Sequence, residues 1–197
     1  MKPQRAPPVF LDRDGTLVVE MGYMSDPNLV RMEEGVVAGL RVLAARGHPL
    51  VVLSNQSGIG RGMFTGEDAQ RVNARLAAML RDHDVEIMAW YLCPHAPKTT
   101  CACRKPLPGM AIAAARDWQL ELTGSYVIGD KRTDLELADA VGGTGILLTT
   151  GHGREYAEWA RGDARPVFDN LRAAADFIVS SGAEAAPVSG DAAGPLP

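Results

Sequence analysis

The sequence lacks three features that would place it in other classes of protein. No apolar run approaches the roughly 18 residues needed to span a membrane, and the first fifteen residues, "MKPQRAPPVFLDRDG", contain no apolar signal core. The formal net charge of −4 gives no electrostatic case for nucleic-acid binding. We therefore expect a cytoplasmic protein that binds neither nucleic acid nor membrane. We also expect a monomer.

Cysteine is also scarce, and all three cysteines lie between residues 93 and 103. An odd number of thiols in a cytoplasmic setting argues against disulfides and favours metal binding or free thiols. With one histidine they form the pattern Cys-x-His-x5-Cys-x-Cys, made of Cys93, His95, Cys101 and Cys103. Three thiolates and one imidazole complete a tetrahedral zinc site and leave no position open for a substrate. The spacing predicts a structural zinc that fixes Arg104 and Lys105; the alternative is free cysteines beside a solvated histidine.

Short apolar runs alternate with longer amphipathic segments along the 197 residues. The expected strands cover residues 8–12, 48–55, 86–93, 125–130 and 144–150. The expected helices cover residues 34–47, 65–84, 107–119 and 133–143, with a short strand and a closing helix within 167–180. Apolar strands separated by helices predict an α/β fold, a doubly wound, Rossmann-like parallel sheet sandwich without a large cap domain. We expect one domain over residues 1–180 and a disordered tail over residues 181–197, which are rich in small residues.

Polar side chains follow several of these strands, where open parallel sheets bind their ligands. Asp12 and Asp14 follow the first strand, and Asp130 follows the fourth. Three convergent carboxylates repel one another unless a cation neutralises them, and oxygen ligands of this kind suit Mg²⁺. Asp134 is either a supporting carboxylate of this site or an early acidic residue of its helix.

Four short motifs resemble the haloacid dehalogenase superfamily of phosphotransferases: "LDRDGT", "VVLSN", a lysine in "CRKP", and "VIGDKRTD". The resemblance implies that Asp12 is the nucleophile and Asp14 the acid/base. It further implies that Ser54 binds the phosphoryl group, that Lys105 is the third-motif lysine, and that Asp130 binds Mg²⁺.

Longer stretches resemble the D-glycero-D-manno-heptose-1,7-bisphosphate 7-phosphatases, among them "SNQSGIGRG" and "YVIGDKRTDLELA". This implies a cytoplasmic Mg²⁺-dependent hydrolase of heptose biosynthesis that removes the 7-phosphate through an aspartyl-phosphate intermediate. The substrate-binding residues would be Glu20, Tyr23, Asn55, Gln56, Ser57, Arg104 and Lys131. Mg²⁺ would lie on Asp12, Asp14 and Asp130.

Three alternatives stay open. The related histidinol-phosphatases share the zinc loop and the short x5 spacing, so histidinol phosphate or another small sugar phosphate is a second substrate class. A phosphotransferase such as a mutase would share the aspartyl-phosphate step, although the absence of a cap argues against it. A non-catalytic, zinc-stapled binding domain would be expected to have lost Asp12 or Asp14, and both are present.

Overall fold

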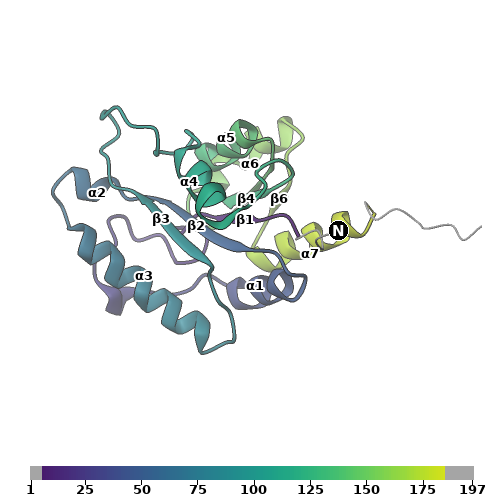
Figure 1. Cartoon of the computed structure of the whole chain (residues 1–197), viewed down its shortest axis with the longest axis horizontal. Helices are drawn as coiled ribbons and strands as arrows, with labels where there is room; N and C mark the ends of the chain where they lie inside the picture. The colour runs from purple at the N-terminus through teal and green to yellow at the C-terminus, as the bar shows by residue number, and fades with distance from the viewer. Residues whose placement is uncertain (1–5, 185–197) are drawn as a thin grey trace, which may run out of the picture.

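The computed structural model describes residues 6–184, which fold around a central sheet (Figure 1). The sheet is parallel and has six strands in the order β3-β2-β1-β4-β5-β6. The strands are β1 (Val9–Leu11), β2 (Leu50–Asn55), β3 (Ala89–Cys93), β4 (Tyr126–Gly129), β5 (Thr144–Leu148) and β6 (Val167–Phe168). The central strand β1 is fully buried, as its three apolar residues predict. The expected doubly wound sheet is therefore confirmed.

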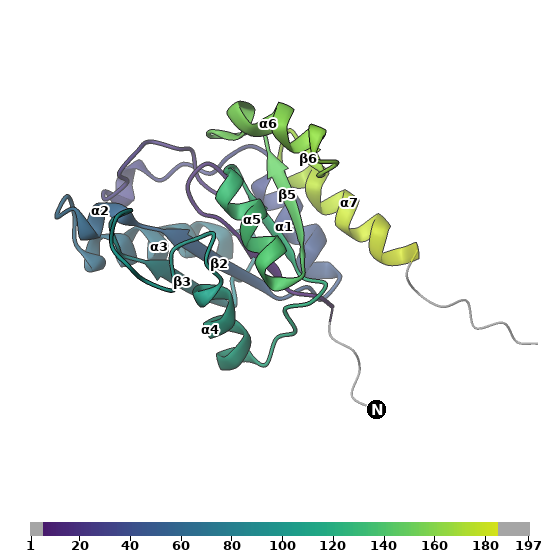
Figure 2. The same cartoon turned by 90° about the horizontal axis from the view of Figure 1, so that it is seen from above.

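Helices cover both faces of the sheet (Figures 1 and 2). They are α1 (Val36–Ala45), α2 (Ser57–Gly60), α3 (Gly66–Arg81), α4 (Gly109–Trp118), α5 (Arg132–Val141), α6 (Gly153–Gly162) and α7 (Leu171–Glu184), with a 3₁₀ helix, η1 (Pro27–Leu29). Apolar residues of α1, α3 and α7 form one core with the sheet, and those of α4 and α5 form a second core on the other face. A smaller cluster joins α5 and α6.

Helix α3 begins where its sequence signal predicts. The Thr65 hydroxyl accepts a hydrogen bond from the Asp68 main-chain N–H at 3.1 Å, and the Asp68 carboxylate accepts one from the Thr65 N–H at 2.7 Å. This reciprocal arrangement satisfies two N–H groups that helix geometry would leave without partners. The expected capping box at residues 65–68 is confirmed.

The structure adds elements that the sequence pattern did not predict. Helix α6 fills the interval between β5 and β6, where no helix was expected, and its apolar side is narrow, with Gly153, Ala157 and Ala160 buried. Helix α7 continues to Glu184, so the segment expected to be a disordered tail begins within a helix, and its remainder, 185–197, lies outside the described residues. Over residues 6–184 no helix has the length and apolarity to cross a bilayer.

The sheet order places one crevice between β1 and β4. Chain connections run outward in opposite directions from these two neighbouring strands, toward β2 on one side and β5 on the other. Open α/β sheets bind ligands beyond the carboxyl ends of strands at such a switch point. The segments after β1 and β2 contain only η1, α1, α2 and α3 before the next strand in the described structure, so no large cap covers the crevice.

Candidate active site

Two aspartates leave the sheet side by side at this crevice. Asp12 directly follows β1, and Asp130 directly follows β4. The Asp12 main-chain N–H donates to the Ile128 carbonyl at 2.9 Å, which holds the ends of the two strands together. Parallel pairing of β1 with β4 is therefore what brings these distant carboxylates into one site.

A third carboxylate joins them. Oxygens of Asp12, Asp130 and Asp134 all lie within 4.8 Å of one another, and the three residues are 7%, 0% and 1% exposed. Burial, reinforced by the Asp12 charge, raises the pKa of Asp130 to about 7, and burial also raises the pKa of Asp134. Buried carboxylates this close repel one another when ionised, so a nearby positive charge is needed to stabilise them.

Lys105 supplies one such charge. Its Nζ lies 2.8 Å from Oδ1 of Asp12 and 2.7 Å from Oδ1 of Asp134. Burial opposes the charged form, but the two carboxylates outweigh it and raise the pKa of Lys105, so the lysine is an ammonium here. The Asn55 side chain braces the Lys105 main chain, since it donates to the carbonyl at 3.2 Å and accepts from the N–H at 3.0 Å. Asn55, expected to bind substrate, therefore has both ends of its amide engaged.

The cluster retains an oxygen that suits a cation. Oδ2 of Asp130 accepts a hydrogen bond from the His152 main-chain N–H at 2.9 Å, but its Oδ1 is buried with no hydrogen-bond partner among the described residues. A buried carboxylate oxygen without a donor is costly unless a cation binds it. Oxygen donors from Asp12 and Asp130 are the ligand type that Mg²⁺ prefers, so these residues fit the ion.

The Asp14 carboxylate lies outside this cluster and makes other contacts. The Arg13 guanidinium donates to it from Nε at 3.1 Å, and Gln56 donates to it from Nε2 at 2.8 Å. Burial raises the pKa of Asp14, while the Arg13 charge opposes that rise and the Asp12 charge adds to it. The same Gln56 nitrogen donates to the Ser54 hydroxyl at 2.7 Å. Ser54 is 2% exposed, so it is joined to the acid/base candidate through Gln56.

A cleft of about 680 Å³ opens above these groups. The sequence-predicted residues that line it are Asp12, Asp14, Glu20, Tyr23, Asn55, Gln56, Ser57, Arg104, Lys105 and Lys131. Pro97, Thr99, Leu107 and Thr133 also line it and were not predicted. Pro97 and Thr99 lie between the expected zinc ligands in the sequence, and closure of that loop is the signal that could have placed them at the cleft.

Glu20 and Lys131 form an ion pair across the cleft. Lys131 Nζ lies 3.2 Å from Oε2 of Glu20 and 3.5 Å from Oδ2 of Asp130. Burial disfavours the lysine charge, but Asp12, Asp130 and Glu20 outweigh it and raise the pKa of Lys131. The other Glu20 oxygen accepts the Gly22 N–H at 2.7 Å. The Glu20 carboxylate is therefore already balanced by protein groups.

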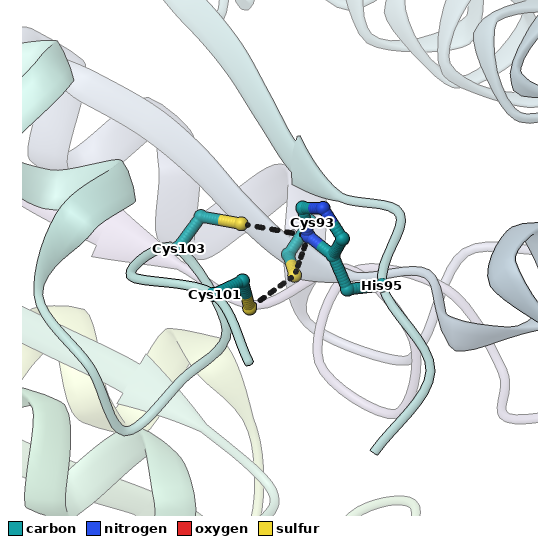
Figure 3. Close-up of side chains that lie close together, drawn as sticks. All are labelled: Cys93, His95, Cys101 and Cys103. Carbon is teal, nitrogen blue, oxygen red and sulfur yellow. Dashed lines mark hydrogen bonds between the residues drawn. The ribbon is translucent and has the colours of Figure 1, made fainter. Parts of the chain in front are cut away.

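The cysteine loop closes on itself (Figure 3). Cys93 Sγ lies 3.9 Å from Cys101 Sγ and 3.5 Å from His95 Nδ1, and His95 Nδ1 lies 3.2 Å from Cys103 Sγ. The sulfurs are too far apart for a disulfide. A tetrahedral ion with Zn–S bonds of ~2.3 Å holds its ligands ~3.7 Å apart, which these separations approach. The expected set of four ligands thus comes together and fits zinc.

Two contacts link this loop to the cleft. Arg104, directly after the last cysteine, donates from Nη1 to the His95 carbonyl at 3.3 Å. The Gly60 N–H of α2 donates to the Pro94 carbonyl at 2.8 Å. The loop therefore supports Arg104 on one side and the α2 turn, which begins at Ser57, on the other.

The chain is similar to proteins of known name over most of its length. A family described as "HAD-hyrolase-like" matches residues 102–174. The chain is 37% identical, over 90% of its length and 92% of the relative's, to the D-glycero-beta-D-manno-heptose-1,7-bisphosphate 7-phosphatase of Yersinia pestis. With the protein of that name from Escherichia coli strain K12, identity is 35% and coverage is 89% of each chain.

Solved structures agree with these relatives. The structure of D,D-heptose 1,7-bisphosphate phosphatase from B. bronchiseptica, complexed with magnesium and phosphate, superposes with a TM-score of 0.81 at 29% identity, covering 89% of this chain and 99% of that one. The corresponding protein from Burkholderia thailandensis gives a TM-score of 0.67 at 27% identity, with the same two coverages.

Proposed function

We propose a function on the premise that this chain belongs to the D-glycero-beta-D-manno-heptose-1,7-bisphosphate 7-phosphatase family of haloacid dehalogenase-like hydrolases. The chain hydrolyses the 7-phosphate ester of D-glycero-D-manno-heptose 1,7-bisphosphate. One observation carries the proposal: Asp12 and Asp130 meet at the ends of β1 and β4, with Lys105 Nζ 2.8 Å from Asp12. This arrangement gives a nucleophile surrounded by charges that can accept a phosphoryl group.

The residues divide the reaction between them. Asp12 attacks phosphorus in line, and the bond from phosphorus to the sugar oxygen breaks as an aspartyl phosphate forms. Asp14 donates a proton to the departing alkoxide and then takes one from the water that cleaves the aspartyl phosphate. Lys105 keeps Asp12 in place and offsets negative charge beside it. Mg²⁺ on Asp12 and Asp130 would supply the remaining positive charge; the expected participation of Asp14 in holding it stays a prediction.

The charges of the cleft favour a bisphosphate over histidinol phosphate. Arg104 and Lys131 line the cleft and can bind the phosphate that is not cleaved. Histidinol phosphate carries an ammonium, and Glu20 is the acidic side chain best placed to receive it. Lys131 and the Gly22 N–H already engage Glu20. The proposed contacts to the sugar come from Glu20, Tyr23, Asn55, Gln56, Ser57, Arg104 and Lys131, with Ser54 supporting the phosphoryl group.

The test compares kcat/KM for heptose 1,7-bisphosphate and histidinol phosphate, with ³¹P NMR to identify the ester that is cleaved. We expect a preference for the bisphosphate of on the order of 10²-fold or more. Histidinol phosphate has no second phosphate, so it would leave the charges of Arg104 and Lys131 without a ligand. Comparable values, or cleavage at position 1, would overturn the substrate assignment. An Asp12→Asn protein, checked for deamidation by mass spectrometry, should be inactive, whereas Asp26→Asn should match wild type.

The setting of the reaction is part of the proposal. A sugar bisphosphate, with up to four negative charges, does not cross membranes unaided, so we place the enzyme in the cytoplasm with its substrate. We also expect a monomer, because all proposed catalytic groups come from one chain. Sedimentation of active protein as a dimer would contradict that expectation.

A further inference from the structure

Arg13 stands between the two catalytic aspartates of "LDRDGT", and its side chain is fully buried. Its Nε donates to both Asp14 oxygens, at 3.2 and 3.1 Å, and its Nη2 lies 2.9 Å from Oδ2 of Asp14. Its remaining nitrogen, Nη1, donates to Oδ1 of Asn73 at 2.9 Å. The guanidinium therefore links the proposed acid/base to a residue sixty positions later.

Asn73 comes from an element outside the crevice. It lies on α3, between Val72 and Leu76, both of which are fully buried against the sheet. An arginine has donors and no acceptor, so the amide oxygen of Asn73 is the atom that must face it. A buried guanidinium remains charged, and each N–H it leaves without a partner carries a penalty. The Asn73 oxygen thus holds the one nitrogen of Arg13 that does not face Asp14.

We propose that Asn73 is a positioning residue for proton transfer, acting through Arg13 on Asp14; this inference rests on the proposed function. The Asp14 carboxylate is held from one side by Arg13 and from the other by Gln56, clear of the Asp12, Asp130 and Asp134 cluster. Without Asn73 the buried guanidinium keeps its contacts with Asp14 but is no longer anchored to α3, so the Asp14 carboxylate is held less firmly toward the leaving group. Effective proton transfer depends on such fixed geometry.

The test uses the chemistry of the leaving group. A sugar alkoxide needs a proton as it departs, whereas 4-nitrophenolate departs without one. Asn73→Leu, which removes the acceptor at similar volume, should lower kcat/KM for heptose 1,7-bisphosphate by about 10- to 100-fold. It should change kcat/KM for 4-nitrophenyl phosphate by less than about 3-fold, because phosphoryl transfer to Asp12 is intact. Asn73→Asp, which retains an acceptor oxygen, should restore most of the sugar-phosphate activity.

The control is Gln70→Leu, an exposed position of α3, which should match wild type on both substrates. Equal losses on both substrates would overturn the inference, because they would indicate general damage to the fold. Wild-type values on both would also overturn it. If Asn73→Leu does not fold, Asn73→Ser gives the same comparison with a hydroxyl too short to reach Nη1. Failure of the proposed function would appear separately, as wild-type protein that does not hydrolyse the heptose bisphosphate.

Discussion

Lys105 Nζ lies 2.8 Å from Oδ1 of Asp12, and both groups are almost completely buried. The pair does not stand alone, because Oδ1 of Asp134 lies 2.7 Å from the same ammonium and forms a second ion pair with it. Since Asn55 fixes the Lys105 main chain, the ammonium is held by both its side-chain and its main-chain contacts. In the proposed reaction the lysine is thus preorganised beside Asp12, where it offsets the negative charge of the phosphoryl group that Asp12 accepts.

Replacement of Lys105 by methionine should therefore abolish most of the activity. We expect kcat for phosphate release to fall by at least 10²- to 10³-fold, the usual effect of losing one preorganised donor. Lys98→Met, an exposed position of the zinc loop, is the matched control and should retain wild-type kcat. A Lys105→Met protein that turns over at more than a tenth of the wild-type rate would show that this ammonium does not assist the reaction.

Zinc removal should weaken substrate use before it unfolds the sheet. The loop supports Arg104 through the His95 carbonyl, and its three cysteines belong to or pack against the second core. The first core, which holds the sheet against α1, α3 and α7, contains none of them. We expect one zinc per chain by elemental analysis, and a loss of zinc in Cys103→Ser accompanied by a rise in KM. The Tm should fall by about 5 °C, which corresponds to roughly 2 kcal/mol in a chain of this size. His83→Ala should keep its zinc. Full activity with an unchanged Tm in chelated protein would refute a structural role for zinc.

Gly15 should tolerate no side chain, for two separable reasons. Its φ of +82° is unfavourable for other residues, and an added Cβ would collide with the Asp130 carboxylate. Gly47 has a similar φ of +76° but open space around it, so Gly47→Ala measures the backbone cost alone, about 1–2 kcal/mol. Gly15→Ala should lose more stability than this in urea titrations and should also lose Mg²⁺-dependent activity. Equal stability losses in the two variants would mean that Asp130 moves aside without cost.

The capping box of α3 makes a pH-dependent contribution to stability. Hydrogen bonds from the Thr65 main-chain N–H and then from its hydroxyl lower the pKa of Asp68 below 3.8, its ordinary value. A carboxylate with a lowered folded-state pKa stabilises the fold above the unfolded pKa and loses that effect as pH falls through the folded value. Asp68→Asn should therefore be less stable than wild type at pH 7, and the two should converge as pH falls below 3.8 and through the lowered folded-state pKa of Asp68. A stability difference that stays constant with pH would contradict this assignment.

Thr65 provides the other half of the same box. Thr65→Ala should cost about 1 kcal/mol of unfolding free energy, since its hydroxyl satisfies the Asp68 N–H at the helix start. Thr99→Ala, an exposed threonine outside the helices, should cost much less in the same urea titration. The Thr65 variant should retain activity, because fraying of the first turn of α3 leaves Asn73, further along the helix, in place.

Several features were predictable because they depend on local sequence and on general rules of sheet topology. Apolar runs defined the five longer strands, and the Thr65 to Asp68 spacing defined the start of α3. Cysteines and a histidine that are close in sequence necessarily meet when their loop closes. By contrast, α6 escaped prediction because its buried residues are glycine and alanine, which give a weak apolar signal.

The sequence by itself determined the parallel sheet, and it predicted the two aspartates of the first motif and the Cys₃His set, because periodicity and short spacings encode them. Only the tertiary structure decided which carboxylates share the buried cluster. Asp14 and Asp134 show the difference: the first turns to Arg13 and Gln56, and the second joins Asp12 through Lys105. The direction of a side chain depends on partners from strands and helices that are distant in the sequence. Those partners come together only when the chain folds.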